Sequence, residues 1–114
     1  MSKLFYLASP YTGTKEEVES RMELLCKSDA KLMKAGYLTV SPLLKHYIIH
    51  HESLPGDWAY WKEYSEELLI HCRGMIVVMT EGWRNSTGVL AEIAFCISNG
   101  IEVLYFDPYK MAFD

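Results

Sequence analysis

The segment Met75-Ile76-Val77-Val78-Met79 is apolar at every position and shows no alternation between apolar and polar side chains. A strand with this pattern must be covered on both faces, and a parallel sheet with helices on both sides provides such cover. We therefore expect residues 75–79 to form a central strand of a parallel sheet.

Other short apolar segments alternate along the chain with helical patterns. Thr14 and Glu17 form a capping box that predicts a helix running to about Lys34, and Asp57 is the expected N-cap of a second helix. The predicted strands are residues 4–8, 37–40, 75–79 and 102–106, and the predicted helices are residues 14–34, 58–71 and 87–99. The stretch from Ser41-Pro42 to Pro55-Gly56 is less regular and is expected to be the longest loop-like region.

This order of elements predicts one α/β domain covering residues 1–114. Parallel strands joined by right-handed helical crossovers give a Rossmann or flavodoxin-like fold, with a four-stranded parallel sheet and helices on both faces. The chain has 114 residues, which leaves no room for a separate substrate domain.

Composition narrows the classes of partner. The net charge is −4 and the 11 Lys and Arg residues are scattered, so we expect no nucleic acid polymer as a partner. The apolar runs are too short to span a bilayer and the first residues lack the apolar stretch of a signal peptide, which predicts a cytoplasmic protein without membrane contact. Cys26, Cys72 and Cys96 lie far apart in helix-like apolar patterns, which favours reduced core thiols.

Glu92 is the only charged residue between Arg84 and Glu102. A helix that is apolar on nearly every side is buried, and a lone carboxylate within it must be paired, hydrogen-bonded or functional. Glu92 lies about a turn and a half into its helix, on the same side as Gly88, where a ligand could approach the backbone closely. The alternatives are that Glu92 lies on a solvent strip of the helix or in an internal ion pair.

In a parallel sheet, ligands bind at the carboxyl ends of the strands, which here are followed by residues 9–13, 41–46 and 81–88. Tyr11 and Trp83 in these loops could stack on a base or cover a sugar, or they could anchor the loops. His46 could contact a substrate from the same edge. Although His46 and His50 are four residues apart, no Glu or Cys joins them at a recognised ligand spacing, so we expect no metal and no other cofactor.

Several motifs occur in an order typical of one family. Leu7-Ala8-Ser9-Pro10-Tyr11 follows the first strand, and Ser86-Thr87-Gly88-Val89-Leu90-Ala91-Glu92 precedes the last. With these segments the chain resembles the superfamily of nucleoside 2-deoxyribosyltransferases and nucleoside 5′-monophosphate N-glycosidases. Leu54-Pro55-x-Asp57-Trp58, Gly82-Trp83-x-x-Ser86 and Gly100-x-x-Val103 look like an uncharacterised bacterial and phage branch of it.

The resemblance implies that Glu92 attacks the anomeric carbon of a nucleoside or nucleoside 5′-monophosphate. It also implies that the first loop, with Ser9, Pro10 and Tyr11, lines the pocket. Where the transferases hold an acidic residue six positions before the nucleophile, the monophosphate glycosidases hold serine, and this chain has Ser86. Ser86 is therefore expected either to help bind a 5′-phosphate or to act only as the helix N-cap.

The general acid is the least defined part of this prediction. By motif the nearest acidic candidate is Asp57, which could equally be a simple N-cap. Where many relatives carry another aspartate, this chain has Ser65. That departure motivates an alternative, a non-catalytic nucleotide sensor on the same fold, while a purely structural module would leave Glu92 unexplained.

Relatives usually form dimers or larger assemblies in which a neighbour helps to complete the pocket. Size and resemblance together therefore predict a homodimer or a higher homo-oligomer.

Overall fold

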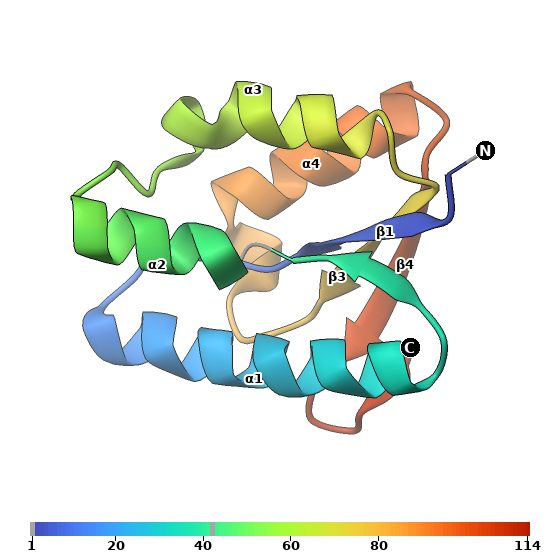
Figure 1. The fold of residues 1–114 in the computed structure, drawn as a ribbon, viewed down its shortest axis with the longest axis horizontal. Coiled ribbons are helices and arrows are strands. Elements are labelled where there is room, and N and C mark those ends of the chain that lie inside the picture. The colour runs from blue at the N-terminus through green and yellow to red at the C-terminus, as the bar shows by residue number, and fades with distance from the viewer. Residues whose placement is uncertain (1, 42) are drawn as a thin grey trace.

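The structure is a computed structural model that describes residues 2–41 and 43–114. These residues form five strands in a single sheet, four α-helices and one 3-10 helix (Figure 1). In chain order the elements are β1 (Leu4–Ala8), α1 (Lys15–Lys34), β2 (Leu38–Val40), α2 (Leu43–Glu52), α3 (Trp58–Leu69), β3 (Gly74–Val78), the 3-10 helix η1 (Trp83–Asn85), α4 (Thr87–Ser98), β4 (Glu102–Asp107) and β5 (Ala112–Phe113).

The strand order is β2-β1-β3-β4-β5. The first four strands are parallel to their neighbours, and β3 lies between β1 and β4 with every residue buried, which confirms the central strand expected at residues 75–79. The expectation of a wholly parallel, four-stranded sheet is wrong, because β5 pairs with β4 in the antiparallel direction.

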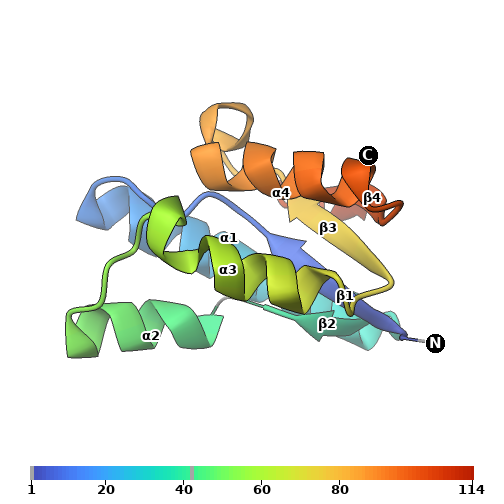
Figure 2. The same cartoon turned by 90° about the horizontal axis from the view of Figure 1, so that it is seen from above.

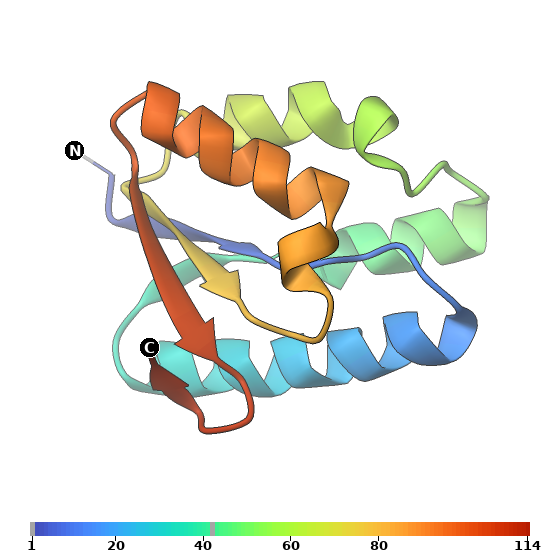
Figure 3. The same cartoon turned by 180° about the vertical axis from the view of Figure 1, so that it is seen from behind.

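A tight turn after β4 produces this extra strand (Figure 3). The Asp107 carboxylate accepts hydrogen bonds from the backbone N–H groups of Tyr109 (2.8 Å) and Lys110 (3.2 Å), and Met111 has a positive φ of 54°. The chain therefore reverses at once and adds Ala112–Phe113 to the edge of the sheet. An aspartate that binds backbone two and three residues ahead is a recognised turn former, but a strand of two residues leaves no periodic pattern.

Helices cover both faces of the sheet. In Figure 1, α1 runs below the strands, and α3 and α4 lie above them. Successive strand residues point to opposite faces, so Phe5 and Leu7 pack toward α1 while Tyr6 and Ala8 pack toward α3 and α4. Two separate apolar cores result, one on each face of the sheet.

The beginning and end of α1 agree with the sequence prediction. Thr14 is the N-cap, and both hydrogen bonds of the capping box with Glu17 are present. The helix ends at Lys34, and Gly36 follows with a φ of 98°, a left-handed conformation that glycine adopts without strain. Of the three cysteines, Cys72 and Cys96 are buried as expected, but Cys26 is exposed, because it lies on the outer side of α1.

The stretch expected to be loop-like contains the helix α2. It lies beyond the carboxyl end of β1, at the left of Figure 1, and its side chains Tyr47 and Ile48 are exposed. Pro42, placed by the sequence prediction at the end of the second strand, lies outside the described residues. Among the helices of the described chain, none combines the length and the apolar content that crossing a bilayer requires.

Candidate active site

A cavity of about 650 Å³ opens at the carboxyl edge of the sheet. Its walls come from the end of β1 and the following loop, from α2 and α3, and from the beginning of α4. Most of the residues expected at a binding site line it, namely Ser9, Pro10, Tyr11, Asp57, Ser86, Gly88 and Glu92. The topology thus brings together residues from three separated parts of the sequence.

Glu92 lies at the wall of this cavity with only 6% of its surface exposed. It is not on a solvent strip of α4, which removes one of the two alternatives to a functional role. The other alternative, an internal ion pair, is also not met, because no Lys, Arg or His nitrogen among the described residues lies within 4.0 Å of its carboxylate.

Two buried hydroxyl groups accompany Glu92. Tyr6 on β1 and Ser65 on α3 are both buried, and their hydroxyl oxygens are hydrogen-bonded at 3.3 Å. Tyr6 also forms a side-chain hydrogen bond with Glu92. Because hydroxyl groups rotate, Tyr6 can donate to an ionised Glu92 while Ser65 donates to Tyr6. Ser65 therefore supports Tyr6 through its hydroxyl group and brings no second acid to the site.

Burial controls the ionisation of this cluster. Desolvation raises the pKa of Glu92 to about 7, and the hydrogen bond from Tyr6 opposes this rise. The pKa of Tyr6 lies well above its usual value, first because of burial and then because of the neighbouring charge of Glu92. Near neutral pH, Glu92 thus exchanges between a carboxylic acid and a carboxylate while Tyr6 keeps its proton.

The beginning of α4 forms the wall next to Glu92. Ser86 is the N-cap, and its hydroxyl accepts a hydrogen bond from the Val89 N–H at 3.3 Å. The N-cap role expected for Ser86 is confirmed, although the residue also lines the cavity. A Cβ atom on Gly88 would sit 3.5 Å from the Trp58 ring, an ordinary van der Waals distance, so this helix contact does not by itself require glycine.

Asp57 and Tyr11 lie at the mouth of the cavity. Asp57 occupies the N-cap position of α3 but forms no capping hydrogen bond with its side chain, and it is exposed. The Tyr11 hydroxyl lies 3.0 Å from Nδ1 of His46, which connects the first loop to α2. His46 itself does not line the cavity, so the expectation that it contacts a substrate directly is not met, and it reaches the cavity wall only through its contact with Tyr11.

Trp83 does not reach the cavity at all. It belongs to η1 and packs on Tyr105 with ring centroids 5.6 Å apart, while the Arg84 guanidinium lies 5.2 Å from its ring centre. The sequence placed Trp83 in the correct loop, but the 3-10 turn directs the indole toward the apolar core under α4. Trp83 is therefore a loop anchor, the alternative that the sequence left open.

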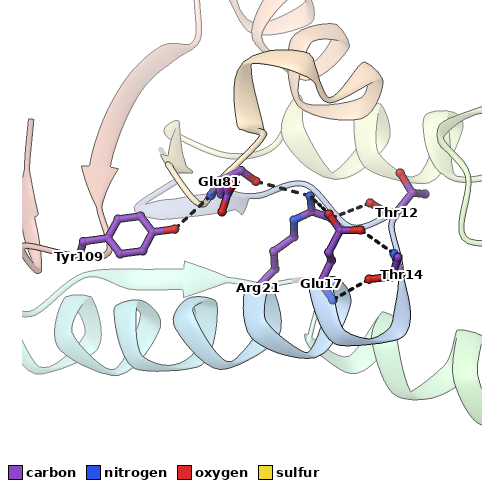
Figure 4. Close-up of polar contacts among 6 residues, drawn as sticks. All are labelled: Thr12, Thr14, Glu17, Arg21, Glu81 and Tyr109. Atoms are coloured by element: carbon purple, nitrogen blue, oxygen red, sulfur yellow. Dashed lines mark hydrogen bonds and ion pairs between the residues drawn. The ribbon is translucent and has the colours of Figure 1, made fainter.

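Arg21 ties the loops around the cavity together (Figure 4). Its guanidinium donates to the Thr12 carbonyl oxygen at 2.6 Å and to the Glu81 carbonyl oxygen at 3.5 Å, and it lies 3.9 Å from the Glu17 carboxylate. The Glu81 N–H in turn donates to the Tyr109 hydroxyl at 3.2 Å. No local sequence signal indicates this network, because Arg21 and Glu81 alone are 60 residues apart.

Lys45 on α2 faces two aromatic rings of α3. Its Nζ lies 4.1 Å from the Tyr64 ring centre and 5.6 Å from the Trp61 ring centre, and all three residues line the cavity. The sequence prediction overlooked Lys45, because it lies in the stretch that was expected to be irregular. No group of three or more His, Cys, Asp or Glu residues suited to a metal ion occurs within the described part of the chain.

Comparison with known proteins gives a family match. A family model described as a domain of unknown function (DUF1937) matches residues 3–107. None of the curated protein sequences matches this chain.

Proposed function

Since the chain belongs to the DUF1937 family, whose description names no activity, we propose its function from the site: it cleaves the N-glycosidic bond of a nucleoside or nucleoside 5′-monophosphate, with Glu92 as the nucleophile. The observation that carries this proposal is a carboxyl group that is almost fully buried, lacks a cationic partner among the described residues, and borders a cavity. Burying such a group costs free energy, and groups with strongly shifted pKa values cluster at functional sites.

The chemistry follows from the ionised form of Glu92. A carboxylate oxygen attacks C1′ of the sugar, the C1′–N bond breaks, and its electron pair leaves with the base. The glycosyl ester then yields to water or to a second base, which releases the carboxylate. Tyr6 positions the carboxylate, and Asp57 at the cavity mouth is our candidate for passing a proton between solvent and the base.

The fold supports the same proposal. We assign it to the flavodoxin-like group of doubly wound folds, since the order β2-β1-β3-β4 is the one in which ligands bind where the strand order reverses, beside β1 and β3. Tyr6 on β1 and the loop after β1 lie at that point. The resemblance of residues 7–11 and 86–92 to the deoxyribosyltransferase superfamily adds the substrate class.

The size of the cavity suits a nucleotide, since ligand pockets of about 300–1,000 Å³ are typical for small molecules. We place a 5′-phosphate near the backbone N–H groups at the start of α4, where the helix dipole favours an anion.

We also propose that the chain is cytoplasmic and forms a homodimer, and a mass measurement by light scattering tests the latter.

The decisive experiment incubates the full chain with each common ribo- and deoxyribonucleoside and its 5′-monophosphate and detects the free base by chromatography. Glu92→Gln keeps the size of the side chain but removes the nucleophile, and turnover should fall on the order of 10⁴-fold or more. Glu63→Gln, an exposed residue of α3 outside the cavity, is the matched control and should keep full activity. A mass increase of the sugar on Glu92 in rapidly denatured samples would identify the glycosyl ester.

Ser65 favours a second candidate function. Because this buried serine hydrogen-bonds to Tyr6 in place of an acid, the site could bind a nucleotide without cleaving it. Saturable binding in calorimetry with no release of base from any nucleotide would replace the enzyme by a nucleotide sensor.

A further inference from the structure

The cavity holds a fixed positive charge that the proposed function has not yet used. Lys45 reaches from α2 onto the faces of Tyr64 and Trp61. The indole of Trp61 is itself held, because its Nε1–H donates to the Pro55 carbonyl oxygen at 2.6 Å, and its ring meets the Tyr64 ring edge-on at 5.8 Å. The ammonium group therefore lies on an ordered aromatic surface.

This charge has no protein counter-ion. Among the described residues no carboxylate oxygen lies within 4.0 Å of the Lys45 ammonium. The faces of aromatic rings attract a cation but leave its N–H donors without acceptors. A lysine in this state is ready to donate hydrogen bonds to a ligand oxygen that carries negative charge.

The position of Lys45 indicates which part of a ligand it meets. In Figure 2, α3 lies between α2 and α4. Lys45 belongs to α2 and Ser86 caps α4, so the two residues line the cavity from different elements. A phosphate at the start of α4 would leave the other end of the nucleotide, the base, on the side of Lys45. Tyr64 and Trp61 support this orientation, because aromatic side chains bind planar bases by stacking and contribute nothing comparable to a phosphate.

We infer that Lys45 binds a carbonyl oxygen of the base and stabilises the negative charge that the base acquires as it leaves. This inference rests on the proposed function and deepens it by naming the substrate class, which is nucleotides whose base carries an exocyclic carbonyl group, such as hypoxanthine, guanine or uracil. The positive charge of the ammonium group stabilises the leaving base, a task that a protonated acid beside Glu92 would otherwise perform by donating a proton.

The step balances without any further reactant. As Glu92 forms its bond to C1′, the electron pair of the C1′–N bond passes to the base, and resonance places the charge on the carbonyl oxygen next to Lys45. The lysine stays protonated throughout, and the base anion afterwards takes a proton from water. Charge stabilisation by a preorganised group of this kind is worth about 10²–10³-fold in rate.

The experiment compares two leaving groups in the wild-type chain and in Lys45→Met. The first substrate is inosine 5′-monophosphate, and the second is 7-methylguanosine 5′-monophosphate, each in the ribose and the 2′-deoxyribose form. The 7-methyl base is cationic before cleavage and leaves neutral, so it needs no stabilisation of negative charge. We expect Lys45→Met to lower kcat on the inosine nucleotide about 10²–10³-fold and to leave kcat on the 7-methyl nucleotide unchanged.

Three controls accompany this comparison. Lys45→Arg keeps the charge and should restore much of the rate, and Lys62→Met removes an exposed lysine of α3 outside the cavity and should change neither rate. With inosine, which lacks the phosphate, Lys45→Met should lower kcat by the same factor as with inosine 5′-monophosphate. If Lys45→Met lowers kcat on the monophosphate but not on inosine, Lys45 acts on the phosphate and the inference is overturned. Equal losses on both leaving groups would show a structural role and overturn it as well.

A binding measurement separates this inference from the proposed function. Calorimetry with inosine 5′-monophosphate on Glu92→Gln and on the double variant Glu92→Gln, Lys45→Met should show weaker binding in the double variant. If the wild-type chain cleaves nothing but binding still depends on Lys45, the proposed function fails and the base contact is supported. If the chain cleaves the nucleotide and Lys45→Met, like Lys62→Met, changes neither rate, the proposed function stands and the inference fails. If the chain neither cleaves nor binds a nucleotide, both fail.

Discussion

The two faces of the sheet differ in where their buried polar side chains lie relative to the cavity. The core under α1 has apolar side chains at its centre, among them Phe5, Leu7 and Leu25, and the polar residues that α1 buries, Ser28 and Asp29, do not line the cavity. The core under α3 and α4 is built on the same strands, yet it includes the buried polar cluster of Tyr6, Ser65 and Glu92. Removing water from polar groups costs free energy that apolar residues of the same size would not require. We therefore assign stability to the α1 face and chemistry to the α3 and α4 face.

The largest effect should come from the α1 face. Leu25 is fully buried there, so Leu25→Ala should lower the free energy of unfolding by about 2–5 kcal/mol, as measured by urea denaturation. Met33→Ala, which changes an exposed residue of the same helix, should stay within about 0.5 kcal/mol of the wild type. If the comparison of the faces is correct, folded Leu25→Ala also keeps the wild-type pH profile, and a displaced profile would show that the two cores are coupled.

Glu92→Gln should raise the free energy of unfolding, whereas Leu25→Ala lowers it. The pKa of Glu92 in the folded chain, about 7, lies above its value in the unfolded chain, so folding favours the protonated form. This contribution is fully present below the unfolded pKa and is lost as the pH rises toward 7, a loss of roughly 3 kcal/mol. At pH 8, Glu92→Gln should therefore be more stable than the wild type by about that amount, and near pH 4 the difference should vanish. Equal stability of the two chains at pH 8 would mean that the carboxylate is well solvated.

Much of this division could be predicted from the sequence. The unbroken apolar run at residues 75–79 indicated a strand covered on both faces, and a single carboxylate in the apolar segment 89–97 indicated a buried charge. Both are local patterns, and the physical rule behind each depends on nothing outside the segment. The capping box at Thr14 is local in the same sense and was predicted with its partner.

The parts that were missed depend on contacts between distant residues. Tyr6 reads as one more apolar strand residue until α3 and α4 place Ser65 and Glu92 beside it. The helix α2 is rich in His, Tyr and Ile, which have modest helix propensity. The role of Lys45 depends on its contact with an aromatic ring of α3, which the sequence of α2 does not reveal. Trp83 was placed at the cavity because loop membership is visible in a sequence, whereas the direction of a side chain in a 3-10 turn is not.

Tyr6→Phe tests the polar cluster without changing its volume much. The hydrogen bond from Tyr6 lowers the pKa of Glu92, so its loss should raise that pKa further. Because the carboxylate is the nucleophile, activity rises with pH, and the rising limb of kcat/KM should move to higher pH in Tyr6→Phe. We expect a loss on the order of tenfold at pH 6 and little loss at pH 9. A uniform loss at every pH would instead assign Tyr6 to the orientation of the substrate, and Tyr60→Phe, an exposed residue of α3, serves as the control.

Thr14→Ala should have the smallest effect on stability. It tests whether the N-terminus of α1 can be weakened without changing the activity. It removes the N-cap oxygen that accepts from the Glu17 N–H at 3.2 Å, and loss of such a cap costs about 1 kcal/mol. The Glu17 carboxylate would still bind the backbone N–H of residue 14, and Arg21 would still hold the loops through the Thr12 and Glu81 carbonyl oxygens (Figure 4). The melting temperature should therefore fall while the pH at which activity rises stays fixed, because that pH is determined by burial on the opposite face of the sheet. If the midpoint of the pH profile moves together with the melting temperature, the α1 face also takes part in positioning Glu92, and the division between the two faces is wrong.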